Sequence, residues 1–324
     1  MKASDVGIVV IGRNEGTRLL DCLASLGDLV RRTVYVDSGS TDGSQANAAL
    51  AGAQIVNLSR AIPFTAARAR NAGVETLLQL WPDLHFVQFI DGDCTLDPAW
   101  IGAAKAILLE KPEIALVCGR RREKHPSHST YNAMCDREWD GPLGPILECG
   151  GDFLVRVDRF RAVGGFRSSL IAGEEPELCL RLREQNWQIW RLPREMTLHD
   201  ANILHFRQWW QRSVRAGHAF AEVSLLHRRS PRRIWRRNTV RALAWAALAP
   251  TAILGALVSP WFGALLLAYP ASFIRQAIRS GSSRSPNWRD PAFFMLAKFA
   301  ETQGILKYHF LRLARRPSAL IEYK

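Results

Sequence analysis

Short hydrophobic runs alternate with segments of helical spacing through the first hundred residues. The runs are rich in β-branched side chains, which predicts strands at 6–11, 33–36, 54–58 and 87–90. Leucine and alanine recur at helical intervals between them and predict helices at about 19–26, 45–50 and 63–80. Strands that alternate with helices predict a doubly wound α/β fold, with a mostly parallel sheet covered by helices on both faces.

Polar clusters follow three of these predicted strands. Asn14 and Glu15 follow the first, a polar stretch at 37–44 follows the second, and Asp91-Gly92-Asp93 ends the fourth. Because the carboxyl ends of parallel strands meet at one edge of a sheet, we expect these clusters to converge. Two carboxylates at the mouth of a buried strand need a cationic partner, and a divalent ion that bridges to phosphate oxygens supplies one. Taken alone, the Asp-Gly-Asp triplet fits an ordinary turn equally well.

The pattern is less regular after residue 100. The predicted elements are a strand at 115–119, a tight turn at 149–152 that leads into a strand, a helix from 174, and strands at 189–192 and 196–199. The basic run at 120–125 either rims an acceptor cleft or forms a solvated edge strand. The hydrophobic residues at 131–145 recur with neither a helical nor a strand period. Glu174 and Glu175 suit the first turn of a helix, so capping alone would explain them.

The segment 242–274 contains no charged residue. Prolines and glycines divide it, which predicts two short apolar helices at 242–258 and 261–274 joined at Ser259-Pro260. Each helix is near or below the spanning length, so a re-entrant or tilted hairpin competes with a two-pass hairpin. A hairpin buried in a soluble dimer is the third possibility. A further amphipathic helix with basic flanks is expected between about 293 and 316, as at a membrane interface.

Composition and charge narrow the class of protein. The chain has 324 residues, of which 48% are hydrophobic and 23% are charged, and this composition is typical of globular proteins. Its formal net charge is +13. The basic excess is concentrated at 207–241, next to the uncharged segment, and no nucleic-acid recognition motif accompanies it, so lipid is favoured over nucleic acid. Six scattered cysteines indicate buried thiols in a reducing compartment. No leader-like segment precedes the first strand, so the catalytic part is expected to face the cytoplasm.

Several ordered motifs together resemble a known enzyme family. They are Asn14-Glu15, the 37–44 stretch, Arg70-Asn71 before the fourth strand, and Asp91-Gly92-Asp93. In this order they resemble the family 2 glycosyltransferases of the GT-A fold, and the likeness runs from about residue 6 to residue 199. The resemblance implies inverting transfer from a nucleotide-diphospho-sugar, with Mg²⁺ or Mn²⁺ held by the Asp-x-Asp motif.

The resemblance also implies roles for single residues. Nucleotide-sugar contacts are expected from Asn14, Glu15, Asp37, Ser38, Arg70, Asn71, Asp91 and Gly92. Asp37 suits a base N–H or ribose hydroxyls, and Arg70 suits a phosphate. Glu15 has the alternative of a solvated loop charge. The metal ligands implied are Asp93, Asp91 and His199.

The acidic pair of the family falls at Glu174-Glu175, where this chain has Glu in place of the usual Asp. Glu175 is the expected general base for the acceptor hydroxyl, and Asp152 is the alternative. The longer side chain of glutamate implies an acceptor slightly further from the helix.

These observations predict four regions. They are a catalytic domain at 1–205 with a donor half at 1–100 and an acceptor half at 101–205, basic interfacial helices at 206–241, a membrane or re-entrant hairpin at 242–278, and an amphipathic segment at 279–324. The expected enzyme lies on the cytoplasmic face of the inner membrane and transfers a sugar, from a UDP-linked donor, to a lipid-linked or cell-envelope glycan. Transfer to polyprenyl phosphate and a non-catalytic nucleotide-sugar-binding membrane scaffold are the alternatives.

Overall fold

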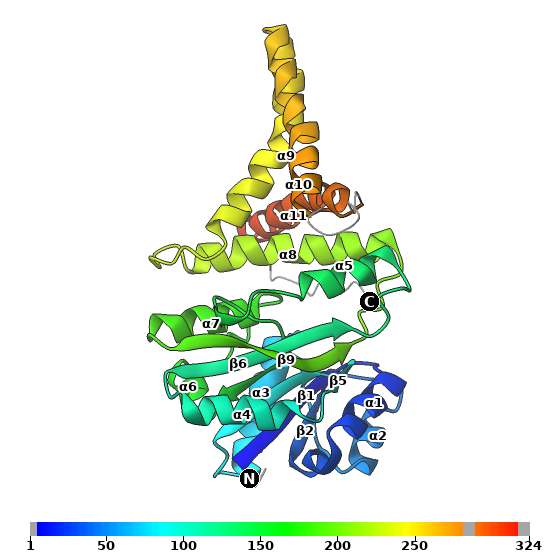
Figure 1. The fold of residues 1–324 in the computed structure, drawn as a ribbon, viewed down its shortest axis with the longest axis vertical. Helices are drawn as coiled ribbons and strands as arrows, with labels where there is room; N and C mark the ends of the chain where they lie inside the picture. The colour runs from blue at the N-terminus through cyan, green and yellow to red at the C-terminus, as the bar shows by residue number, and fades with distance from the viewer. Residues whose placement is uncertain (1–4, 281–288, 317–324) are drawn as a thin grey trace. The chain divides into compact units, whose positions relative to one another are not determined.

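The computed structural model describes residues 5–280 and 289–316. The chain divides into two compact units, Met1–Leu204 and His205–Lys324 (Figure 1). The first unit is a mixed α/β structure and the described part of the second is helical.

A nine-stranded sheet forms the centre of the first unit, among the residues that the structure describes. Its strands are β1 (Val6–Gly12), β2 (Thr33–Asp37), β3 (Gln54–Asn57), β4 (Phe86–Asp91), β5 (Cys94–Leu96), β6 (Ile114–Glu123), β7 (Gly144–Ile146), β8 (Phe153–Arg156) and β9 (Gln188–His199). Their order is β3-β2-β1-β4-β8-β6-β9-β5, and β7 pairs with β9. β1 and β4 therefore lie inside the sheet, and the ends of β2, β1 and β4 are neighbours.

The sheet changes character at β4. β3, β2, β1 and β4 are parallel, as the alternating pattern predicts. β8 is antiparallel to both β4 and β6, and β5 and β7 are antiparallel to β9, so the second half is mixed. The alternative of a solvated edge strand at 120–125 is wrong, because β6 continues to Glu123 and pairs with β9 along that stretch. The two strands predicted at 189–192 and 196–199 are one long strand, β9.

Helices of the first unit follow the strands closely. They are α1 (Thr17–Ser25), η2 (Gly27–Arg32), α2 (Ser44–Leu50), α3 (Ala66–Leu80), α4 (Trp100–Glu110), α5 (Thr130–Glu138), α6 (Val157–Ala162) and α7 (Glu174–Glu184). α3 begins three residues later than predicted, because the Thr65 side chain accepts a hydrogen bond from the Arg68 amide (3.1 Å) and caps the helix there. The segment 131–145, which has no clear sequence period, contains most of α5 and the start of β7.

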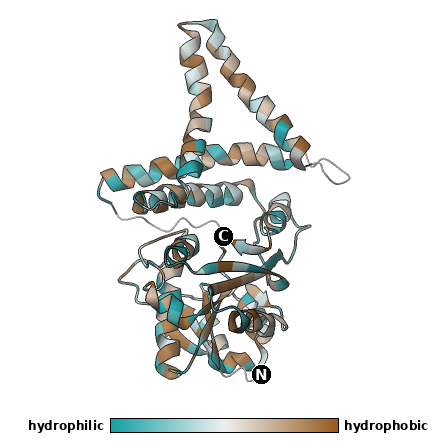
Figure 2. Cartoon of the chain, turned by 60° about the vertical axis from the view of Figure 1, so that its left-hand side comes forward, coloured by the Kyte–Doolittle hydropathy of each residue, from teal (hydrophilic) through white to brown (hydrophobic). Residues whose placement is uncertain are grey.

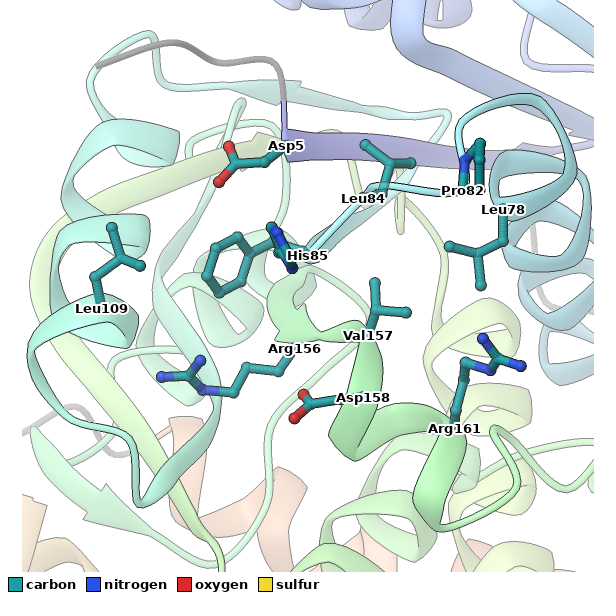
Figure 3. Close-up of a pocket in the computed structure, with 11 residues that line it drawn as sticks. Asp5, Leu78, Pro82, Leu84, His85, Leu109, Arg156, Val157, Asp158 and Arg161 are labelled. Carbon is teal, nitrogen blue, oxygen red and sulfur yellow. The ribbon is translucent and has the colours of Figure 1, made fainter.

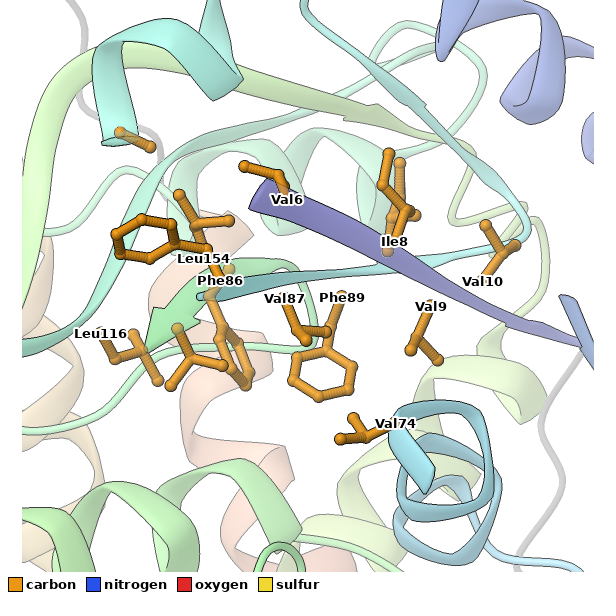
Figure 4. Close-up of a cluster of buried hydrophobic side chains, with 14 of the residues drawn as sticks. Val6, Ile8, Val9, Val10, Val74, Phe86, Val87, Phe89, Leu116 and Leu154 are labelled. Carbon is orange, nitrogen blue, oxygen red and sulfur yellow. The ribbon is translucent and has the colours of Figure 1, made fainter. Parts of the chain in front are cut away.

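The hydrophobic core packs around β1 and β4 (Figure 4). Val9 of β1 lies so close to α3 that a Cβ at Gly73 would come within 2.5 Å of it. On β4, Phe89 contacts three further aromatic rings, those of Phe153, Phe160 and Phe166, at centroid separations of 5.0–5.6 Å. Removing one such buried ring costs about 3–5 kcal/mol in comparable cores. The end of β4 is therefore carried by a rigid part of the sheet.

The second unit consists of helices in its described part. They are α8 (Phe206–Leu226), α9 (Arg236–Ala256), η3 (Pro260–Leu267), α10 (Ala268–Ser280) and α11 (Arg289–Leu313). A Cβ at Gly217 of α8 would lie 1.9 Å from the Glu301 carbonyl, and one at Gly304 of α11 would lie 2.0 Å from the Val214 carbonyl. Two glycines thus let α8 and α11 cross with their backbones in contact.

α9, η3 and α10 form a helical hairpin, which Figure 2 colours by hydropathy. The first leg begins at Arg236 rather than at 242, and the second changes from 3₁₀ to α geometry at Ala268. Among the described residues, α9 is the one helix long and apolar enough to cross a membrane. The predicted end of the amphipathic helix is close to Leu313, where α11 ends, and residues 281–288 of the predicted segment 279–324 lie outside the described residues.

Candidate active site

The Asp-Gly-Asp motif lies where β4 ends beside β1. The Gly92 amide donates to the Ile11 carbonyl (2.8 Å), and a Cβ on Gly92 would lie 3.1 Å from the same oxygen. Glycine therefore lets the turn lie directly against β1. Asp93 is buried after this turn, and Asp91 remains half-buried at the end of β4.

Arg70 of α3 joins three carboxylates of the site. Its Nη1 donates to Glu174 (3.0 Å) and Glu175 (2.9 Å), and its Nη2 donates to Asp91 (2.9 Å). The guanidinium is buried, so water screens these ion pairs weakly. A residue that the sequence predicts as a phosphate contact is thus the link between the Asp-Gly-Asp motif and the predicted base.

Gly151 makes that link possible. A Cβ at this position would lie 2.5 Å from Arg70 Nη2 and 2.9 Å from an Asp91 carboxylate oxygen. The sequence shows Gly150-Gly151 only as a tight turn, and only the packing distinguishes the two glycines. Gly150 has open space where a Cβ would stand.

Arg121 of β6 is the second cation of the site, and the sequence did not single it out from the basic run. It donates to Asp152 from Nε (2.9 Å), and its Nη2 lies 2.7 Å from Asp152 and 3.3 Å from Asp91. Burial alone would raise the pKa of Asp91, but Arg70 and then Arg121 lower it below its usual value. Asp91 is therefore an anion, and each of its two carboxylate oxygens forms an ion pair with an arginine.

Asp152 lies in the interior of this network. Besides Arg121, its carboxylate accepts hydrogen bonds from the Asp91 amide (3.1 Å) and the Thr197 hydroxyl (2.7 Å). Its side chain has no exposed surface. The alternative assignment of Asp152 as general base therefore loses its structural support, because an acceptor hydroxyl has no access to this carboxylate.

Glu175 is the more accessible of the two glutamates that open α7. Its side chain is 14% exposed, against 4% for Glu174. Burial and the neighbouring Glu174 raise the pKa of Glu175 to about 7, despite Arg70. A carboxylate that titrates near neutral pH is suited to accept a proton from a hydroxyl.

Asp93 and His199 meet across the β5–β9 pair. The Nε2 atom of His199 lies 3.3 Å from Asp93 Oδ2, and His199 Nδ1 is buried without a hydrogen-bond partner in the described structure. Two adjacent ligands at ~2.2 Å from an ion stand ~3.1 Å apart, so this pair can share one. Cys94 lies in the same group, but burial raises the pKa of its thiol well above the usual value, so it is a neutral thiol. The Asp93 carboxylate fits Mn²⁺ or Mg²⁺, whereas an imidazole is a more usual ligand for transition-metal ions than for Mg²⁺.

Trp139 covers one side of this arrangement. Its ring lies edge to face with His199 (4.9 Å between centroids) and beneath the Arg121 guanidinium (5.6 Å). It belongs to the 131–145 segment, where the sequence pattern gave no signal. Trp139 therefore fixes the orientation of two polar side chains of the site.

The loops after β1 and β2 lie at the same edge of the sheet. Gly12 is in register with Asp37, and Ile11 with Asp91. Asp37 accepts from the amides of Gly39 and Ser40 (both 2.8 Å) and from Gln45 (2.9 Å). Burial would raise the pKa of Asp37, but these hydrogen bonds lower it overall. This carboxylate is an anion already held by its own loop.

The other side chains predicted to contact the nucleotide-sugar are held in the structure by different partners. Asn14 accepts from the Thr41 amide (2.8 Å) and so ties the first polar loop to the second, and the Ser38 amide donates to the Gly12 carbonyl (3.1 Å). Glu15 pairs with Arg18 at 2.7 Å. Asn71 uses its amide group to hold the backbone of Phe166 and the Ser168 hydroxyl, so it orients a loop and is not joined to the Arg70 cluster.

A cavity of about 540 Å³ lies elsewhere, at the edge of the sheet where β4 begins and β8 ends (Figure 3). Asp5, His85 and Arg156 are among its lining residues. The Arg156 guanidinium already donates to backbone carbonyls, including that of Ile114 (2.9 Å). None of the candidate active-site residues lines this cavity, so it is separate from that site.

Comparisons with known proteins show which family this chain resembles. A sequence profile of glycosyl transferase family 2 matches residues 7–159. The pre-mycofactocin glycosyltransferase of Mycobacterium tuberculosis is 26% identical over 235 residues, which cover 69% of this chain. The succinoglycan biosynthesis protein ExoA of Rhizobium meliloti is 24% identical over 253 residues, which cover 75% of this chain and 71% of that protein. The chain spans about half, 48%, of the length of the mycobacterial relative.

The fold is also found among solved structures. The mannosyltransferase PcManGT from Pyrobaculum calidifontis, solved in complex with GDP-Man and Mn²⁺, aligns with a TM-score of 0.62 at 17% identity. The alignment covers 93% of this chain and 87% of the archaeal one. The profile match shows that residues 7–159 resemble glycosyl transferase family 2, and the structural alignment shows a shared GT-A fold.

Proposed function

We propose that the chain transfers a sugar, with inversion, from a nucleotide-diphospho-sugar to an acceptor hydroxyl. The observation that carries this proposal is the buried Arg70 guanidinium, which joins Asp91 of the Asp-Gly-Asp motif to Glu175 at 2.9 Å each. One side chain thus fixes the donor-side motif and the candidate base relative to each other, as an in-line displacement requires. A donor complex with Mn²⁺ in the archaeal structural neighbour supports the donor class.

On the donor side, Asp93 and His199 would hold Mg²⁺ or Mn²⁺. The ion, when bound, offsets the negative charge that develops on the leaving diphosphate. Asp91 keeps both carboxylate oxygens on arginines and would orient the donor through ribose or a metal-bound water. Asn14, Asp37 and Ser38 lie on the neighbouring loops, where a nucleoside would be recognised. We infer a UDP-linked donor.

On the acceptor side, Glu175 would take the proton of the attacking hydroxyl. Its partial exposure and its pKa of about 7 support this role. Glu174 would hold Arg70 in place, since its side chain is almost fully buried against that guanidinium.

The acceptor that we infer is a lipid-linked or cell-envelope glycan at the cytoplasmic face of the inner membrane. The basic and apolar second unit supports a membrane location. The name of the Rhizobium relative, a succinoglycan biosynthesis protein, supports an envelope or exported polysaccharide as the context.

Calorimetry with UDP-glucose, and with GDP-mannose as a second donor, tests the donor site. We expect binding only with Mn²⁺ or Mg²⁺ present, and a loss of at least about tenfold in affinity for Asp93→Asn. Asp83→Asn, a change of the same kind at an exposed position before β4, should bind like the wild type. Donor binding that is indifferent to both the metal and Asp93 would exclude this metal site.

Polyprenyl phosphate is the second candidate acceptor, because the eleven arginines at 223–289 favour an anionic lipid. A phosphate oxygen is already ionised and needs no general base. Glu175→Gln would then keep most of the turnover with a polyprenyl phosphate, while losing about 10²–10⁴-fold with a hydroxyl acceptor.

Release of nucleoside diphosphate with membrane extract as acceptor would exclude the non-catalytic scaffold.

A further inference from the structure

The charge of the second unit is distributed unevenly around its hairpin. Residues 223–289 contain eleven arginines and no acidic residue, which accounts for most of the +13 net charge of the chain. The arginines stand on either side of the hairpin, and the segment 242–274 between them has no charge. A surface of this kind is complementary to anionic lipid head groups beside hydrocarbon.

Aromatic contacts hold the two legs of the hairpin together. The Tyr269 hydroxyl donates to the Trp245 carbonyl (3.0 Å), and their rings meet edge to face at 5.0 Å. Nearer the tip, a Cβ on Gly255 would lie 2.3 Å from the Phe262 ring, so glycine lets that ring lie against α9. The hairpin is therefore a packed pair of legs with a defined turn.

The turn satisfies its own backbone hydrogen bonds. The amides of Val258 and Ser259 both donate to the Gly255 carbonyl, at 2.8 and 2.9 Å, and the Phe262 amide donates to the Ser259 carbonyl at 3.1 Å. Pro260 has no amide hydrogen to satisfy. Irregular backbone is excluded from hydrocarbon chiefly because unpaired polar groups are costly there, and these three amides of the turn are paired.

Three large apolar side chains of the turn are exposed to solvent. Leu257, Val258 and Trp261 are 84–86% exposed. The loop of a two-pass hairpin would have to place these side chains in water on the far side of the membrane. α9 reaches ~32 Å as an α-helix only if its first six residues are counted, and these include Arg236, Arg237 and Arg241. The uncharged part of the first leg, 242–258, is only ~25 Å long, against ~30 Å for a typical hydrocarbon core.

We propose that the hairpin is re-entrant: it enters an anionic membrane from one side, ends with residues 257–262 in the hydrocarbon, and returns. Both arginine-rich flanks then lie at the head groups of the same leaflet. This topology rests on the membrane location in the proposed function, but not on its donor or its chemistry.

Thiol labelling in vesicles tests the topology. The full-length chain is reconstituted into vesicles of phosphatidylcholine and phosphatidylglycerol with Val258→Cys at the tip, or with Pro231→Cys in the exposed loop before α9 as the matched control. The six native cysteines are buried and should give little background. We expect an impermeant maleimide to label Pro231→Cys from outside and Val258→Cys from neither side, whereas denaturation in SDS should expose both thiols.

Two results would overturn the proposal. Labelling of Val258→Cys by maleimide trapped in the lumen would show a two-pass hairpin, and labelling from outside would show that the tip does not insert. Flotation with phosphatidylcholine vesicles alone should recover much less protein than with phosphatidylglycerol present, and equal recovery would contradict the role of the arginines. Donor turnover measured in the same samples separates a failure of this topology from a failure of the proposed enzyme.

Discussion

Arg70 shows how one buried side chain organises the candidate site. Its guanidinium faces Asp91, Glu174 and Glu175, so it is surrounded by more negative charge than it can neutralise. Removing one partner of a buried ion pair typically costs about 3–5 kcal/mol, because the other charge is left uncompensated. Burial, and then the excess of negative charge, raise the pKa of Glu175, so it stays protonated at a pH where an exposed glutamate is ionised.

The raised pKa of Glu175 predicts the acidic limb of the pH profile. A general base acts only when it is deprotonated, so kcat/KM for a hydroxyl acceptor should rise with pH through about 7 and then level off. In Glu175→Gln the remaining activity should lack this limb. Glu184→Gln, at the exposed end of the same helix, should keep it. An unchanged limb in Glu175→Gln would assign the titration to another group.

Two adjacent glycines provide a second test at this scale. Gly151→Ala should displace Arg70 from Asp91 and lower kcat/KM by at least about tenfold, since a 1 Å displacement in an active site can cost about 10²-fold. Gly150→Ala should be nearly neutral, because a Cβ there meets no atom within 4 Å. Steady-state kinetics and thermal unfolding of both variants would check this, and equal activities would contradict the packing argument.

Sequence reasoning reached some of these residues and not others, for physical reasons. Asp91 and Asp93 follow from a strand end, which is a local signal, whereas Glu175 follows from the resemblance to a family motif at a helix start. Arg121 does not, because register shifts of β6 at Cys118/Arg120 and Arg120/Arg121 interrupt the simple alternation that would show which arginine points into the site. Asn71 has the expected chemistry but a structural contact, which only the packed loop reveals.

At the scale of elements, buried ion pairs join strands that lie far apart in the sequence. Arg121 of β6 meets Asp152 just before β8 and Asp91 of β4, and Thr197 of β9 completes the group. The hydrophobic pattern predicted the parallel strands β1 to β4 because each is a local run. It did not predict the antiparallel β8 between β4 and β6, because strand order depends on contacts between distant segments.

A double-mutant cycle tests this cross-strand pair. Arg121→Met should lower the free energy of unfolding by about 3–5 kcal/mol, because it leaves the Asp152 carboxylate buried and unpaired. Adding Asp152→Asn should recover part of that loss, since the amide oxygen still accepts hydrogen bonds without carrying a charge. Chemical denaturation of the two single variants and the double variant measures the coupling, and additive losses would show that the two residues act independently.

At the scale of the whole molecule, the chain divides after Leu204, and the core around β1 and β4 lies in the first unit. The last residues of this unit are anchored to its interior. The Ala201 amide donates to Glu123 (3.0 Å), and Ile203 donates to Asn132 (3.0 Å) and accepts from the Ser129 hydroxyl (2.6 Å).

These anchors predict where the chain can be truncated. A fragment of residues 1–204 should fold cooperatively and bind the donor without detergent, because it keeps the whole core. A fragment of residues 1–198 should be markedly less stable, since it loses His199 and the three anchoring hydrogen bonds. Thermal unfolding and calorimetry of both fragments would check this, and equal stability would contradict the boundary at Leu204.

The uncharged turn of the hairpin has a consequence for how the protein would enter a membrane in the proposed topology. Carrying an arginine through the centre of a bilayer costs about 2.5–3.5 kcal/mol even on the lower published scales, and between residues 242 and 274 there is none to carry. Inserting the hairpin therefore requires no polar loop to be translocated. Purified full-length protein should insert spontaneously into preformed anionic liposomes after its synthesis is complete, without a secretion channel.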